Sequence, residues 1–326
     1  MPALRIIFMG TAELSCASLG TLVRDEKFRV TAVITQPDKP KGRELKLQPS
    51  PVKALAVELA LPVLQPERAR DEKFIAELRE LKPDLIVVVA YGQILPPAIL
   101  DLPRYGCLNV HTSLLPKYRG AAPIQWAIAN GDVETGVTIM KMDAGLDTGP
   151  ILSQRRTPIH SEDDSATLHD RLAQLGAELL GETVPDYVAG KIQPKPQPAE
   201  GVSYAAKIKK EDGHIDWSRP AQTIWNRLRA FTPWPGAFTF LKVEPKPRLL
   251  KIWKGSIAEE IWHKANPLTD LGIKPGTILS AEKEGIVVAC GKDFLHITEL
   301  QREGGRRMNA AEFLAGHPLK AGEKFG

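Results

Sequence analysis

The sequence predicts an α/β protein in which a doubly wound, mostly parallel sheet is followed by a small antiparallel, OB-like β-barrel. Continuous β-branched runs, such as IVVV at 86–89, are typical of strands buried on both faces of a parallel sheet. These runs alternate with helical patterns through the first part of the chain, which is the order of βαβ units. From residue 237 onward, short alternating runs separated by Gly and Pro favour an antiparallel barrel.

The first part supplies seven expected strands and five expected helices. The strands are RIIFMG (5–10), VTAVIT (30–35), PVLQ (62–65), DLIVVVAY (84–91), CLNVH (107–111), TGVTIMKM (135–142) and PILSQRR (150–156). The helices are SCASLGTLVRD (15–25), PVKALAVELA (51–60), KFIAELREL (73–81), APIQWAIAN (122–130) and the long amphipathic stretch at 166–188. The last helix is expected to close the domain.

A Pro-rich stretch without periodicity divides the chain, because GKIQPKPQPAEGVSYAAKI at 190–208 is typical of an interdomain linker. After it we expect a helix over 222–231 and barrel strands at 237–241, 248–257, 276–290 and 294–301. A length of 326 residues suits two domains. We therefore predict domains at 1–190 and 207–326, joined by a linker at 191–206.

The charge is distributed unevenly between these parts. Residues 1–206 carry 23 Lys and Arg against 25 Asp and Glu, a net charge of −2. Residues 207–326 carry 20 against 14, a net charge of +6. A nearly neutral catalytic part joined to a basic module is expected of a protein that binds a polyanion, although ordinary surface variation gives the same numbers.

Several classes of protein are excluded by composition. The three cysteines are far apart and the seven His lack metal-ligand spacing, so neither a disulfide framework nor a metal site is expected. The longest apolar run near the N-terminus, at 6–9, is too short for a signal peptide or a membrane span. We expect a cytoplasmic protein without a metal cofactor.

Asn109 and His111 are the first candidate catalytic residues. They alternate with Val110 on an expected strand, so both side chains point to one face at its C-terminal end, where ligands collect in parallel sheets. An Asn amide can donate to a developing oxyanion, and His can exchange a proton near neutral pH. Either residue alone is more often a loop hydrogen-bonder. The pair at a spacing of two after a buried run favours catalysis.

A carboxylate from MDAGLDTGPIL, at 142–152, would orient His111 and favour its charged form. We choose Asp147, because LDTG is a tight turn that can present a side chain to a cleft. The opposite assignment, with Asp143 as the partner and Asp147 forming the turn, remains open.

These stretches identify a resemblance to the methionyl-tRNA formyltransferase family of folate-dependent formyltransferases. The central motifs are NVHTSLLPKYRGAAPIQWAI (109–128) and ETGVTIMKMDAGLDTGPIL (134–152). Further matching segments, in chain order, are RIIFMGT, VITQPDKPKGR, QPSPVK, VVVAYGQILP, YAAKI, IDW and RAFTPWPGAF. The resemblance covers nearly the whole chain, and its C-terminal segments indicate the tRNA branch. It implies a Rossmann-like catalytic domain and formyl transfer from 10-formyltetrahydrofolate to the α-amino group of methionine on initiator tRNA.

The family motif assigns roles to individual residues of this chain. Asn109, His111 and Asp147 match the catalytic trio. The residues that match the folate-contacting loop are Ser113, Leu114, Leu115 and Pro116. The residues that would line the pterin pocket are Tyr91, Ile94 and Leu95. The resemblance further implies a translation-initiation role, and we expect a monomer that binds no membrane.

Two basic segments are candidate tRNA contacts. The loop at 36–51 carries Lys39, Lys41, Arg43 and Lys46, and by itself it is typical of a solvated loop. The resemblance places it against the acceptor end of the tRNA, with Arg43 at the motif arginine. Lys207, Lys209 and Lys210 lie where the linker meets the barrel and could contact phosphates.

The chain departs from the family pattern at two places. The family usually has GTPxF after the first strand, whereas this chain has Gly10-Thr11-Ala12-Glu13-Leu14. Thr112 stands where this branch often has Gly, and it would be strained if the backbone there required a positive φ.

Two other functional classes stay open at this point. One is a formyltransferase that acts on a small amine, such as an amino-sugar nucleotide or glycinamide ribonucleotide. The other is a non-catalytic tRNA-binding protein that retains the fold. The basic barrel argues against the first, and the intact Asn, His and Asp argue against the second.

Overall fold

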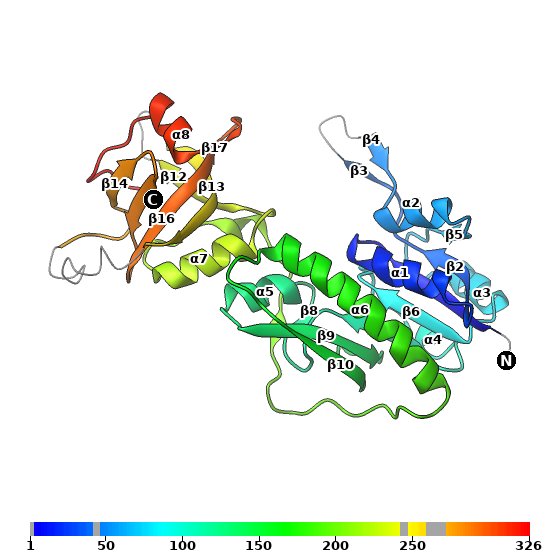
Figure 1. The fold of residues 1–326 in the computed structure, drawn as a ribbon. Coiled ribbons are helices and arrows are strands. Elements are labelled where there is room, and N and C mark those ends of the chain that lie inside the picture. The colour runs from blue at the N-terminus through cyan, green and yellow to red at the C-terminus, as the bar shows by residue number, and fades with distance from the viewer. Residues whose placement is uncertain (1–2, 42–45, 242–246, 259–271) are drawn as a thin grey trace. The chain divides into compact units, whose positions relative to one another are not determined.

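The computed structural model describes residues 3–41, 46–241, 247–258 and 272–326 of the chain (Figure 1). These residues form two compact units. The first comprises the chain up to residue 123 together with 134–158 and 168–205. The second comprises 124–133, 159–167 and the chain from residue 206 onward. The segment predicted as a linker therefore packs with the first unit as far as residue 205, and the domain boundaries stay a prediction.

The first unit is built on a seven-stranded sheet with the order β10-β9-β7-β6-β1-β2-β5. Its strands are β1 (Leu4–Gly10), β2 (Phe28–Ile34), β5 (Val63–Leu64), β6 (Leu85–Val89), β7 (Cys107–His111), β9 (Glu134–Lys141) and β10 (Ile151–Pro158). The five strands from β5 to β7 pair in parallel, whereas β9 and β10 form antiparallel pairs at one edge. The predicted mostly parallel sheet is confirmed.

Helices cover both faces of this sheet, as a doubly wound fold requires. The helices of the first unit are α1 (Leu14–Arg24), α2 (Pro51–Glu58), α3 (Glu72–Glu80), α4 (Pro97–Leu100) and most of α6 (Ser165–Val188); α5 (Pro123–Ala129) lies mainly in the second. Alternate strand residues, such as Ile7 and Met9, pack with α3 and α4. On the other face α6 approaches both α1 and β7, where Gly176 lies against Val110.

The second unit is an antiparallel barrel. Its sheet has the order β12-β13-β16-β15-β14, with β17 paired to β16. Its elements are a 3-10 turn η1 (Lys210–Gly213), α7 (Ala221–Ala230), β12 (Ala237–Leu241), β13 (Arg248–Ile257), β14 (Ile278–Glu282), β15 (Gly285–Ala289), β16 (Phe294–Arg302), β17 (Arg307–Asn309) and α8 (Ala310–Gly316). The C-terminal segment closes the barrel, because Phe325 bridges to Leu241 of β12 and Lys324 bridges to Thr277 just before β14. The predicted C-terminal antiparallel domain is confirmed.

Several short elements were not predicted. The loop at 36–51 contains a hairpin of β3 (Lys39–Lys41) and β4 (Lys46–Gln48), and β8 (Arg119–Gly120) pairs with β11 (Tyr204–Ala205). Helix α8 was also missed, although its capping box, in which Asn309 and Glu312 exchange hydrogen bonds with backbone N–H groups, is visible as an N-x-x-E pattern. Among the described residues, none of the helices combines the length and the apolar character that a bilayer span requires.

Candidate active site

Strand β7 delivers Asn109 and His111 to the same side of the sheet, as their spacing predicts. Asn109 is half-buried and His111 is only 6% exposed. Val110 between them is buried on the opposite face, against α6. Strand β9 pairs beside them in antiparallel register, with Met140 opposite Asn109. β9 ends beside the start of β7, where Lys141 pairs with Leu108, and the loop at 142–150 that follows it carries Asp147 to Asn109 and His111.

Asp147 of that loop meets both residues. The amide nitrogen Nδ2 of Asn109 donates to Oδ1 of Asp147 at 3.4 Å. Nδ1 of His111 lies 3.8 Å from Oδ2 of the same carboxylate. Asp143 instead accepts from the Gly145 N–H and the Thr148 hydroxyl, so it forms the turn. Of the two assignments that the sequence left open, the geometry favours Asp147 as the partner.

Asp147 is held by backbone groups as well as by its two neighbours. Its φ of 52° is in the left-handed region, which Asp tolerates better than most residues. Its Oδ2 accepts from the Gly120 N–H at 2.8 Å. The carbonyl of Asp147 accepts from Nε2 of Gln197, a residue of the Pro-rich segment that no sequence pattern marked as functional. This segment therefore fixes the backbone of Asp147, and the carboxylate itself is fixed by the Gly120 N–H.

The N–H of Gly120 is placed by the short ladder between β8 and β11. Gly120 has a φ of +114°, and a Cβ there would lie 2.7 Å from the carbonyl oxygen of Ala205. Glycine is therefore required at this position for both conformation and space. The adjoining Tyr118 N–H donates to the Ser203 hydroxyl at 2.9 Å. The residues 203–205 thus align the loop that follows β7.

The hydrogen bonds of His111 define its tautomer. Nε2 lies 2.9 Å from the carbonyl oxygen of Tyr118, and a carbonyl can only accept, so Nε2 carries a proton. In a neutral imidazole Nδ1 would then present its lone pair to the carboxylate of Asp147. That arrangement is repulsive, whereas a proton on Nδ1 makes it attractive. Nδ1 is therefore the ring nitrogen that faces the carboxylate of Asp147 and is left to exchange a proton with a substrate.

The loop matched to the folate-contacting motif is ordered by β9 and by its own turn. The Ser113 hydroxyl donates to the Lys117 carbonyl, and the Leu115 N–H donates to the Thr138 hydroxyl. Ser113 and Leu115 are buried, whereas Leu114 and Pro116 are half-buried. Thr112 is not among the residues of positive φ in the described chain, so replacing the family's usual Gly causes no left-handed strain.

The three residues assigned to the pterin pocket are in different environments. Tyr91 and Leu95 are buried within the core between the sheet and α3, whereas the side chain of Ile94 is 90% exposed. Burial raises the pKa of Tyr91 to about 12. Its hydroxyl is buried without a hydrogen-bond partner among the described residues. Such a group usually has a partner in native proteins, so the Tyr91 hydroxyl is a donor and acceptor that the described residues leave unsatisfied.

The candidate tRNA contacts fall in both units. Lys39 begins the β3–β4 hairpin of the first unit, and its Nζ donates to Oε1 of Gln36. Arg43 and the side chains of Lys41 and Lys46 lie outside the described part of the chain. The lysines that start the second unit, Lys207, Lys209 and Lys210, are all exposed.

Comparison with known proteins places this site in a family. A family model described as Formyl transferase matches residues 4–184, and one described as Formyl transferase, C-terminal domain, matches residues 207–318. The chain is 51% identical to the methionyl-tRNA formyltransferase of Citrifermentans bemidjiense, over 100% of this chain and 98% of that protein. It is 50% identical to that of Geobacter sulfurreducens, over the same shares of the two chains.

Solved structures share the fold at low sequence identity. The N-formyltransferase of Helicobacter canadensis, crystallised with folinic acid and dTDP-3-aminofucose, superposes with a TM-score of 0.63 at 19% identity, over 92% of this chain and 100% of that one. HypX of Aquifex aeolicus in complex with tetrahydrofolic acid gives a TM-score of 0.59 at 18% identity, over 99% of this chain and 50% of that one. The two family models and the half-identical relatives decide the assignment: the chain belongs to the methionyl-tRNA formyltransferase family.

Proposed function

We propose that the chain transfers the formyl group of 10-formyltetrahydrofolate to the α-amino group of methionine on initiator tRNA. The observation that carries the proposal is the convergence of Asn109, His111 and Asp147 at the end of β7. About 50% identity to proteins named methionyl-tRNA formyltransferase, over the whole chain, supports the substrate pair. The reaction needs one group for the oxyanion and others for the proton, and the trio supplies both.

In this reaction the uncharged amine attacks the formyl carbon and an oxyanion forms. The Asn109 amide has two N–H groups, and only one of them is directed at Asp147. Among the described residues the second meets no acceptor, so it can donate to the oxyanion. A preorganised donor of this kind is typically worth about 3 kcal/mol in the transition state. Positioning of the amine against the formyl carbon supplies much of the remaining acceleration.

Proton transfer is assigned to Nδ1 of His111, because Nε2 is occupied by the Tyr118 carbonyl. The 3.8 Å between Nδ1 and Asp147 is longer than a direct hydrogen bond and leaves the Nδ1 proton available to the substrate. Asp147 stabilises the imidazolium. It also orients a water that takes the proton from the attacking amine, while Nδ1 gives its own proton to the departing folate nitrogen and regains one from that water.

The folate would lie along Ser113–Pro116 and the exposed Ile94, with its pterin ring near Tyr91. We expect Tyr91→Phe to weaken folate binding by about two- to tenfold, the value of one hydrogen bond of about 0.5–1.5 kcal/mol. The free protein should lose no thermal stability, because the substitution removes a hydroxyl that is buried without a partner. Folate titration and thermal denaturation measure the two effects. A less stable variant with unchanged folate affinity would instead assign the hydroxyl to the core.

The outer face of β12 and β13 supports RNA binding by the second unit. The rings of His214, Phe238 and Phe240 lie with centroids 5.3–6.0 Å apart. Lys251 is paired opposite Phe238 and its ammonium lies 5.4 Å from the centre of the Trp253 ring. Aromatic rings interleaved with cations are typical of surfaces that bind unpaired nucleotides. The partner of this face, under the proposal, is the tRNA.

The exposed lysines at 207–210 give a salt-dependence test. If Lys209 neutralises a phosphate, Lys209→Gln should weaken tRNA binding and reduce the slope of log K against log salt by about one unit. Lys73→Gln, which changes an exposed lysine of α3 in the first unit, is the matched control and should leave the slope unchanged. Binding isotherms at four or more salt concentrations measure the slope. A tRNA affinity that does not depend on salt would contradict the role of these lysines.

The whole proposal is tested by mixing the chain with labelled formylfolate and either methionyl-tRNA or free amines. We expect label on methionyl-tRNA alone. Label on an amino-sugar nucleotide or on glycinamide ribonucleotide would instead establish the small-amine alternative, and no label on any acceptor would leave a non-catalytic RNA-binding protein. A cytoplasmic location and a monomeric state belong to the proposal, and fractionation with sedimentation analysis tests them.

A further inference from the structure

A cavity in the second unit lies far along the chain from the residues assigned to catalysis. It has a volume of about 440 Å³ and lies at the end of the barrel where β12 ends, β13 begins and β16 ends. Helix α8 and the segment after it, residues 317–324, form the other side. The volume is within the range of pockets for small ligands and exceeds that of a bare phosphate ion.

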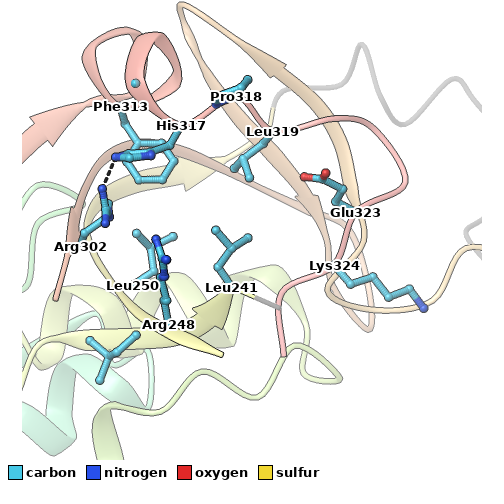
Figure 2. A pocket seen from close by; sticks show the side chains of 12 residues that line it. Leu241, Arg248, Leu250, Arg302, Phe313, His317, Pro318, Leu319, Glu323 and Lys324 are labelled. Atoms are coloured by element: carbon cyan, nitrogen blue, oxygen red, sulfur yellow. Dashed lines mark hydrogen bonds between the residues drawn. The ribbon is translucent and has the colours of Figure 1, made fainter. Parts of the chain in front are cut away.

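The floor of the cavity is apolar. Leu250 and Phe313 are fully buried beneath it, and Leu241 and Leu319 are half-buried at its sides (Figure 2). The imidazole of His317 packs against Phe313 with ring centroids 5.4 Å apart. Leucine side chains and the His317 ring therefore give the cavity a largely apolar wall with one polar ring. A ligand that fills the cavity therefore needs an apolar, preferably planar, part.

Two guanidinium groups share the same cavity. In Figure 2 the side chains of Arg248 and Arg302 rise toward His317, and Glu323 and Lys324 lie at the opposite side. Within the described chain, neither arginine forms an ion pair with a carboxylate. Arg302 donates to Nε2 of His317, which must therefore be the unprotonated nitrogen of that ring. Uncompensated guanidinium groups beside an apolar floor are expected where an anion binds.

The titration of His317 agrees with this local excess of positive charge. Burial, and then the charges of Arg302 and Arg248, lower the pKa of His317 below its ordinary value. Of the other titratable groups that line the cavity, Lys324 adds positive charge and Glu323 is the single carboxylate. An anion bound between the two arginines would offset their charges and so raise the pKa of His317.

We infer that this cavity binds a nucleoside monophosphate unit, with the phosphate on Arg248 and Arg302 and the base over the apolar floor. The fork of a guanidinium matches phosphate oxygens, and the floor matches the ring of a base. The choice of a nucleotide over another organic anion rests on the proposed tRNA substrate. The unit comes either from a free mononucleotide or from an unpaired nucleotide of bound tRNA.

Calorimetric titration of the full chain with AMP tests the inference. We expect saturable binding of AMP, and at least about tenfold weaker binding of adenosine and of inorganic phosphate, because each presents one half of the ligand. Arg302→Gln and Arg248→Gln should each weaken AMP binding at least about tenfold. Arg29→Gln, an exposed arginine of β2 in the first unit, removes the same charge and should bind AMP as the wild type does.

A measurement on the unsubstituted chain covers the case in which a variant does not fold. AMP should raise the pKa of His317 in a histidine NMR titration, with the signal assigned by its loss in His317→Gln. Absence of saturable AMP binding, or equal AMP affinity in both arginine variants and the wild type, overturns the inference. If either of these results is found while formylation is intact, the proposed function stands and only the inference about the cavity fails. If AMP binds but no formylation is found, the inference about the cavity stands and the proposed function fails.

Competition distinguishes the two sources of the nucleotide. If AMP displaces tRNA, and Arg302→Gln weakens tRNA binding more than Arg29→Gln does, then the cavity holds a nucleotide of the tRNA. If AMP binds with tRNA already in place, the ligand is a free mononucleotide. Both results support nucleotide binding in the cavity. The first makes the cavity part of the tRNA-binding surface, and the second makes it a separate site for a free mononucleotide.

Discussion

Asn109→Ala is expected to lower the single-turnover rate of formyl transfer by about a hundredfold to a thousandfold, the usual loss when one oxyanion donor is removed. The residue lies half-buried at the end of β7, with one amide proton directed at Asp147 and the other without an acceptor in the part of the chain that the structure describes. Its loss removes the donor at the moment when charge develops on the formyl oxygen. Rapid mixing of the folate-loaded protein with methionyl-tRNA measures the chemical step apart from product release. We expect a loss of the same order for His111→Ala.

Asn109→Asp is the matched variant for this prediction, because it keeps the size of the side chain and removes its donors. It should be at least as slow as Asn109→Ala, since a second carboxylate would face both the oxyanion and Asp147. Circular dichroism and thermal denaturation establish that each variant is folded. A folded Asn109→Ala protein with a near-normal single-turnover rate would remove Asn109 from the mechanism.

The sheet could be predicted from the sequence because its strands are buried on both faces. Runs such as IVVV at 86–89 have few alternatives to a central parallel strand, and in the structure β6 is buried at every position. The β3–β4 hairpin was missed because Pro40 and three lysines give no apolar alternation. The barrel closure by Phe325 was missed for a related reason, since one buried aromatic residue in a polar segment has no period.

The candidate site was only partly predictable. A strand-end rule placed Asn109 and His111 on one face, and the structure brings them together with Asp147. The choice between Asp143 and Asp147 depended on a backbone conformation, the φ of 52° at Asp147, which residue types do not specify. The groups that orient the site are mostly main-chain atoms, the Tyr118 carbonyl and the Gly120 N–H. Main-chain atoms leave no signature in a sequence, so their roles required coordinates.

Asp147→Asn is expected to lower the single-turnover rate of formyl transfer by about a hundredfold or more, a loss comparable to that of a transition-state donor. The substitution removes the negative charge of the carboxylate and keeps its shape. Asn tolerates a left-handed φ and keeps an oxygen that can accept from the Gly120 N–H, so the turn should survive. Asp147→Ala would also remove the hydrogen bond from the Gly120 N–H and strain the backbone at a positive φ. A slow Asp147→Ala protein could therefore be misfolded, and its rate would not report on the charge alone. Asn at this position no longer stabilises the imidazolium of His111, and its neutral amide holds the water that carries the amine proton less firmly than a carboxylate does.

Asp143→Asn is the control for this substitution, because it lies in the same loop and makes the same change. Asp143 accepts from the Gly145 N–H and the Thr148 hydroxyl, two bonds that an Asn oxygen can also accept. Its formylation rate should therefore stay within about twofold of the wild type, an effect below 0.5 kcal/mol. If Asp147→Asn is as fast as Asp143→Asn and the wild type, the negative charge beside His111 has no part in the reaction. A slow Asp143→Asn protein with a fast Asp147→Asn protein would reverse the assignment that the loop geometry supports.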